Sequence, residues 1–253
     1  MSQLIDNLNT IESIKTDIKT AIENKGVDMT GVSFPGYASK IGEISGGGTV
    51  GWDQKSFTEG TIEIINLDNS ASFVASYAFD GSKTIKTVNL PYATTVYQYA
   101  FQSCSSLTQV NLPMCASIDG SAFYNCTSLS QISIPMCSYI GNSAFYNCKF
   151  SQVSLPMCSY IGNYAFDFCT RLNQISLPVC SYIGGNAFRW CALLSIITLG
   201  YSNICSLAGS TVFNNTQITS SKGSIYVPAS LVDSYKSATN WSYFSTQIFP
   251  ISE

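Results

Sequence analysis

The ten cysteines are the residues of this chain best suited to chemistry, because a thiolate can act as a nucleophile or as a metal ligand. Nine of them recur at steps of ten or eleven residues, which divides them into two alternating sets. The first set is Cys104, Cys126, Cys148, Cys169 and Cys191, and the second is Cys115, Cys137, Cys158 and Cys180. Cys205 follows after a longer gap. Such regular spacing indicates either a repeated reactive group or a repeated structural position.

The spacing favours a structural position. Zinc sites bring together close pairs such as C-x-x-C, and this sequence has none. It also has no histidine, which removes the Cys-His and Ser-His pairs of nucleophilic catalysis. Disulfides between successive members would span about one strand spacing, which is feasible, but the set of five would leave one thiol over. We therefore expect no catalytic residue, no metal and no cofactor, and we interpret the cysteines as small buried hydrophobes, with disulfides or a metal site as the alternatives.

A repeat of about 22 residues surrounds the cysteines. Its prolines are spaced by 22, 22, 21 and 22 residues, and they are Pro91, Pro113, Pro135, Pro156 and Pro178. Within one copy, residues 129–134 read L-x-x-I-x-I, which is typical of a short strand with one buried face. In the next stretch we expect Cys137 and Ile140 to point inward and Tyr139 to point outward. The period and the pattern predict a solenoid in which each repeat forms one coil.

The repeat resembles a known family. The pattern A-F-x-x-C-x-x-L-x-x-I-x-L-P, met by Ala122-Phe123 through Pro135, is similar to the BspA-like (Treponema-type) leucine-rich repeats. The resemblance extends over residues 69–199 and implies a mainly β leucine-rich-repeat solenoid, although such repeats more often place a β-branched residue where this chain has cysteine. It also implies a C-terminal cap, with a strand at residues 223–227, a helix at residues 229–238, and Trp241 and Phe244 covering the end of the core.

The N-terminal segment has a different pattern. Apolar residues at steps of three and four predict an amphipathic α-helix over about residues 3–24, before a glycine tether at residues 46–48. The predicted apolar stripe consists of Leu4, Leu8, Ile11, Ile14, Ile18 and Ile22. This stripe either packs on its own chain or joins copies, and isoleucine at both heptad positions favours a homotrimer. The predicted domains are residues 1–48, 49–68, 69–199 and 200–253.

Residues 25–41, KGVDMTGVSFPGYASKI, resemble the N-terminal anchors of virion proteins of tailed phages of gut Bacteroidota. This resemblance implies a phage fibre or decoration protein that assembles in the host cytoplasm and binds other virion proteins through its N-terminus. The alternative is a bacterial cell-surface adhesin of the BspA-like type. That alternative requires an export signal, and the first residues do not show one, so the virion hypothesis is our first expectation.

Composition narrows the range of partners. Only 11% of residues are charged, the net charge is −3 and there is no basic cluster, which argues against nucleic acid as a partner. No run of about 18 apolar residues is present, so we expect no membrane insertion.

Two outward columns are the predicted binding residues. One contains Gln131, Gln152 and Gln174, and the other contains Tyr139, Tyr160 and Tyr182. Uncharged amides and aromatic rings suit a cell-surface glycan or protein ligand, although the same columns would also stabilise neighbouring coils by stacking. The two residues between Phe and Cys also vary, ending with Asp167-Phe168 and Arg189-Trp190.

Overall fold

The computed structural model describes residues 64–66, 72–200 and 203–251. The chain divides into two units, Met1–Ile62 and Glu63–Glu253, and all described residues belong to the second. The predicted helix at residues 3–24, the glycine tether and the segment that resembles a virion anchor lie outside the described residues.

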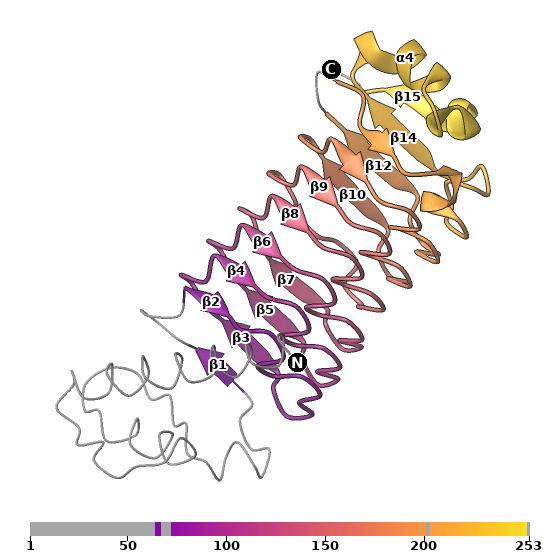
Figure 1. Ribbon diagram of the computed structural model, residues 1–253. Coiled ribbons are helices and arrows are strands. Elements are labelled where there is room, and N and C mark those ends of the chain that lie inside the picture. The colour runs from indigo at the N-terminus through magenta and orange to yellow at the C-terminus, as the bar shows by residue number, and fades with distance from the viewer. Residues whose placement is uncertain (1–63, 67–71, 201–202, 252–253) are drawn as a thin grey trace, which may run out of the picture. The chain divides into compact units, whose positions relative to one another are not determined.

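Each repeat forms one coil with two short strands, and successive coils stack so that the strands make two rows (Figure 1). The first row contains two parallel sheets of four strands each. One sheet consists of β1 (Ile64–Asn66), β3 (Thr87–Asn89), β5 (Gln109–Asn111) and β7 (Gln131–Ser133). The other consists of β10 (Gln174–Leu177), β12 (Ile196–Leu199), β14 (Ser224–Val227) and β15 (Ile248–Pro250). The predicted solenoid of parallel coils is confirmed.

A gap separates these two sheets where the repeat is one residue short. The prolines there are 21 residues apart, because Cys148-Lys149-Phe150 replaces the longer C-x-x-L segment of other copies. Residues 151–155 therefore form no strand, and only an isolated bridge joins Ser154 to Ser176. The buried Phe150 packs its ring edge against Phe145, with ring centroids 5.8 Å apart. One missing residue thus interrupts the ladder while the core remains filled.

The second row is a continuous parallel sheet of seven strands. Its strands are β2 (Phe73–Val74), β4 (Thr95–Val96), β6 (Ser117–Ile118), β8 (Tyr139–Ile140), β9 (Tyr160–Ile161), β11 (Tyr182–Ile183) and β13 (Ser206–Leu207). The coils approach closely just after these strands. A Cβ atom on Gly184 would lie 2.5 Å from the backbone nitrogen of Asn163, so this position requires glycine.

A stack of phenylalanine rings fills the core. Neighbouring centroids lie 5.1–5.9 Å apart, and the rings belong to Phe101, Phe123, Phe145, Phe166, Phe188 and Phe213. Every ring in this stack is fully buried. The A-F-x-x-C segments belong to neither row of strands and form a third side of the coils, which we call the turn side. On the turn side these segments join neighbouring coils through backbone hydrogen bonds. One example is the 2.8 Å bond from the Phe123 N–H to the Ala144 carbonyl.

The C-terminal cap follows the last full repeats. It contains the 3-10 helices η2 (Ser210–Phe213), η3 (Ala229–Leu231) and η4 (Trp241–Gln247), and the α-helix α4 (Val232–Ser237). The predicted helix at residues 229–238 is thus a 3-10 turn that continues into α4. Trp241 is fully buried and Phe244 is 4% exposed, which confirms that they cover the core. Trp241 also donates a 2.6 Å hydrogen bond from Nε1 to the Cys205 carbonyl. Within the described ranges, no helix has the length and apolar character needed to cross a membrane.

Candidate functional site

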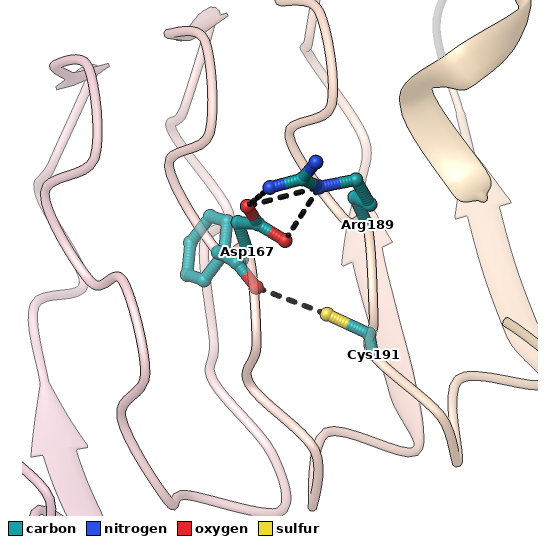
Figure 2. A network of polar contacts seen from close by, with 4 residues as sticks. Asp167, Arg189 and Cys191 are labelled. Carbon is teal, nitrogen blue, oxygen red and sulfur yellow. Dashed lines mark hydrogen bonds and ion pairs between the residues drawn. The ribbon is translucent and has the colours of Figure 1, made fainter. Parts of the chain in front are cut away.

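The cysteines lie in the core, as the sequence predicts. All ten are buried free thiols. In the first set each thiol donates to a backbone carbonyl of the preceding coil. The Cys126 thiol donates to Phe101 at 3.1 Å, and the Cys191 thiol donates to Phe166 at 3.0 Å (Figure 2). Within the part of the chain that the structure describes, no three His, Cys, Asp or Glu side chains are placed to hold a metal ion. The arrangement suits packing and offers no exposed nucleophile.

Burial controls how these thiols ionise. Desolvation raises the pKa of Cys104 to about 12 and that of Cys115 to about 11, although backbone hydrogen bonds partly oppose the shift. Cys180 and Cys205 differ because they share a hydrogen bond, which lowers the pKa of Cys180 and raises that of Cys205. Since the thiolate is the reactive form, most of these groups are poor nucleophiles in the folded protein.

We therefore expect all ten cysteines to be reduced, slow to react when folded and fast to react when unfolded. A thiol reagent added to the denatured, unreduced protein should detect about ten groups per chain, the number of cysteines that the fold holds as free thiols. The native protein should show few of them on the same timescale. A denatured chain with only a few reactive thiols would contradict the interpretation of the cysteines as core residues.

The tyrosine column lies on the seven-stranded sheet. The ring of Tyr160 stacks between those of Tyr139 and Tyr182, with centroids 5.0 Å away on each side. Their ring faces therefore cover one another, while the side chain of Tyr139 is 41% exposed. Desolvation, together with the neighbouring phenols, raises the pKa of Tyr160. The column is a stacked ladder that presents its edges to solvent, which is compatible with both functions considered for it.

The glutamine column lies on the other row of strands, so the six predicted binding residues do not share one surface. Gln131 and Gln174 are exposed on β7 and β10, and Gln152 lies in the interruption between these strands. The structure thus places the two predicted columns on the two different rows of strands.

A groove of about 440 Å³ opens at the interruption. Its lining combines exposed amides and hydroxyls with aliphatic side chains and contains no charged residue: Ile132, Gln152, Val153, Ser154, Gln174, Ile175, Ser176, Ile196 and Thr198. Ile132 is half-buried, whereas its counterpart Val110 in the preceding coil is 1% exposed. The missing residue therefore creates the groove. Two of the three predicted glutamines line it, and the 21-residue spacing was the signal that pointed to it.

A third cluster, on the turn side, was not predicted as a site. Four aromatic rings follow one another there in successive coils, with centroids 4.6–5.7 Å apart: Tyr124, Tyr146, Phe168 and Trp190. The first pair and the last pair are stacked, and the middle pair is tilted by 51°. Beside them, Arg189 donates Nε and Nη2 to the carboxylate of the fully buried Asp167, with a shortest distance of 2.7 Å (Figure 2). The pairing raises the pKa of Arg189, chiefly through its hydrogen bonds to Asp167. The changed residues between Phe and Cys were the signal for this cluster.

Comparison with known proteins identifies the repeat. A family model described as the BspA type leucine-rich repeat region matches residues 52–157 and 138–238, with six copies. Among curated proteins, none matches this sequence.

Several solved structures are similar to the chain. A leucine-rich repeat protein from Bacteroides ovatus is 18% identical, with 65% of this chain and 63% of that chain covered and a TM-score of 0.39. A leucine-rich cell surface protein from Faecalibacterium prausnitzii is 19% identical, with 51% of this chain and 52% of that chain covered and a TM-score of 0.36. The leucine-rich repeat protein of T. pallidum is 27% identical, with 54% of this chain and 57% of that chain covered and a TM-score of 0.39. The chain thus spans 52% to 63% of the length of these three structures.

Proposed function

This chain belongs to the BspA-type leucine-rich repeat family, and from that premise we propose that it is a non-enzymatic adhesin. We propose that it is displayed on a bacterial cell surface and recognises an uncharged ligand there. Leucine-rich repeats of this kind typically serve in binding, and their stacked coils provide a rigid framework with side chains at fixed intervals. The ligand class is a glycan or a protein surface, because the candidate surfaces consist of amides, hydroxyls and aromatic edges.

The observation that carries this proposal is the groove at the interrupted sheet. Its volume of about 440 Å³ lies in the range of small-molecule sites. Its amides and hydroxyls both donate and accept hydrogen bonds, so they suit a ligand rich in neutral polar groups. Ile132, which is half-buried, and Ile196, which is exposed, supply apolar surface between these polar groups.

We expect replacement of the groove amides to weaken binding without unfolding the protein. The full chain would be tested on mucin-coated surfaces and on cultured epithelial cells. The variant Gln152→Ala/Gln174→Ala should bind about ten-fold more weakly, because both exposed side chains line the groove. Gln109→Ala is the matched control, since Gln109 occupies the same column on β5 but does not line the groove. Equal binding by the double variant and the control would reject the groove, and a wild-type chain that binds no surface would reject the adhesin.

The tyrosine column remains a proposed second contact. Its variant, with Tyr139, Tyr160 and Tyr182 all changed to alanine, belongs in the same assay. Loss of binding with an intact fold would assign the column a role in recognition.

The virion hypothesis remains a separate prediction. It rests on residues 25–41, whereas the family match begins at residue 52, so the two proposals rest on different parts of the chain. In that proposal the chain is a homotrimeric fibre or decoration protein, joined to other virion proteins through its N-terminus. Failure of a chain lacking residues 1–48 to enter particles, when the full chain enters them, would support it.

A further inference from the structure

The last two complete repeats place bulky side chains where the backbone favours small ones. In five successive coils the residue before the cysteine has φ between 56° and 60°: Ser103, Asn125, Asn147, Phe168 and Trp190. Asparagine tolerates this left-handed conformation, whereas it is unfavourable for a bulky side chain. Strain of this kind persists where the surroundings hold it and often marks functional positions. Phe168 and Trp190 thus replace the asparagines that serve the same backbone position in two earlier coils, although Tyr77, Tyr99 and Tyr164 show that bulky residues also adopt this conformation elsewhere in the solenoid.

The neighbouring residues change in the same two coils. Where other coils carry Tyr124 and Tyr146, these carry Asp167 and Arg189, and the Asp167 side chain is fully buried while that of Arg189 is 34% exposed. The bidentate pair fixes the plane of the guanidinium and leaves Nη1 with no partner among the described residues. The guanidinium carbon also lies 5.5 Å from the ring centroid of Tyr164. The result is a fixed donor group whose charge Asp167 balances.

The ring stack on the turn side ends at Trp190. One side of the indole stacks on Phe168, with centroids 5.7 Å apart. In the next coil the corresponding position belongs to Asn215. The backbone N–H of Trp190 donates a 2.9 Å hydrogen bond to the backbone carbonyl of Asn214, as in the preceding coils, and Asn215 has a φ of 60°. Asn215 is exposed, and Trp190 is 44% exposed. The indole is thus partly uncovered on the side of Asn215, while the Arg189 guanidinium lies toward the preceding coil, 5.9 Å from the ring centroid of Phe168.

We propose that Trp190, Arg189 and Asn215 bind the ring of a neutral saccharide. This inference rests on the proposed binding function and assigns it a ligand class at a second contact, on the turn side. The C–H face of a pyranose packs on the indole, and its hydroxyls accept from Arg189 Nη1 and exchange hydrogen bonds with Asn215. An anionic ligand gains little electrostatic attraction from this site, because the Asp167 carboxylate already neutralises the charge of Arg189. A purely apolar partner would bury the arginine and asparagine donors without acceptors.

The test is a tryptophan fluorescence titration of the full chain with lactose, maltose and cellobiose, and with sialyllactose as the acidic comparison. The chain has two other tryptophans, Trp241, which is fully buried, and Trp52, which lies outside the described residues. The variant Trp190→Asn keeps both, so it measures their share of any change in emission. At least one neutral sugar should change the emission of the wild type, with a dissociation constant on the order of 1 mM. The response should be at least about ten-fold weaker in Trp190→Asn, which restores the residue type of Asn125 and Asn147. This variant should keep its melting temperature, because asparagine suits the backbone there.

A second variant separates the guanidinium from the indole. Asp167→Tyr/Arg189→Tyr restores the residue type of Tyr124 and Tyr146 without leaving a buried carboxylate unpaired, and it should also weaken the response. Absence of any response to the three neutral sugars, an unchanged response in Trp190→Asn, or a preference for sialyllactose would overturn the inference. Mucin binding that survives periodate oxidation and the Trp190→Asn change would keep the adhesin proposal and assign its ligand to protein.

Discussion

Raising the pH from about 8 to about 10 is expected to remove on the order of 10 kcal/mol from the free energy of unfolding. The cause is the buried thiols, eight of which have a raised pKa because burial penalises the thiolate. In the unfolded chain these groups ionise near their ordinary value of 9.0. In the folded chain they ionise only at about 11 for Cys115 and about 12 for Cys137.

The sign follows from these values. Because the folded pKa lies above the unfolded one, the contribution to stability is fully present below about pH 9 and is lost as the pH rises from there toward the folded values. Each thiol removes about 1.4 kcal/mol per pH unit within that window. The loss by pH 10 is comparable with the whole stability of an ordinary domain, so we expect alkaline unfolding.

Urea unfolding followed by circular dichroism at several pH values between 7 and 10 measures this effect. Cys137→Val is the matched control, because valine fills the same buried position without a titrating proton. Its free energy of unfolding should fall less steeply with pH, by about 1.4 kcal/mol per unit. A stability that does not change between pH 8 and pH 10 would show that the thiols are already ionised or oxidised in the folded protein.

Replacing Phe145 by alanine should destabilise the protein by about 3–5 kcal/mol. The ring is fully buried and lies between those of Phe123 and Phe166, with centroids 5.4 and 5.5 Å away. Phe150 also packs its edge against it. Removal of the ring leaves a cavity that rigid neighbouring coils close only in part, so the cost exceeds the loss of buried area alone.

Tyr139→Ala is the control, since it removes an aromatic ring from the surface of the same coil. Tyr139 is 41% exposed and stacks on a single neighbour, Tyr160. A stacked pair contributes about 0.5–1.5 kcal/mol, so we expect a cost of at most about 1 kcal/mol. Similar costs for the two substitutions in chemical unfolding would mean that the inward and outward positions are wrongly assigned.

The core of this fold could be predicted from the sequence because the same pattern of apolar residues recurs in every repeat. Alternation in residues 129–134 and in Cys137–Ile140 predicted which side chains point inward, and four of the five inward residues are almost completely buried. The inward residues are Leu129, Ile132, Ile134, Cys137 and Ile140. Ile132 is the exception, being half-buried. Its exposure comes from the next coil, where the missing residue removes the strand that would have covered it.

The candidate sites were harder to predict from the sequence, because they depend on how each coil turns and on how neighbouring coils stack. Alternation shows that Tyr139 and Gln131 point outward from two different strands of the coil, and the structure places them on β8 and β7, but alternation does not show how the corner between the strands orients the two columns. Likewise, a spacing of 21 residues reveals a deletion without showing whether a corner or a strand absorbs it. The pairing of Asp167 with Arg189 depends on the stacking of two coils whose residues are 22 positions apart.

The interruption between β7 and β10 also has a mechanical consequence for the solenoid. Hydrogen bonds between neighbouring strands of a sheet run across the strands, which in a solenoid is along the stack. Tension along the stack is therefore carried by each coil-to-coil interface in series. Around residues 151–155 only the seven-stranded sheet is continuous, so these interfaces have fewer strand hydrogen bonds than their neighbours. We therefore expect a steady pull to open the stack there first and to separate the C-terminal coils as a unit with their cap attached.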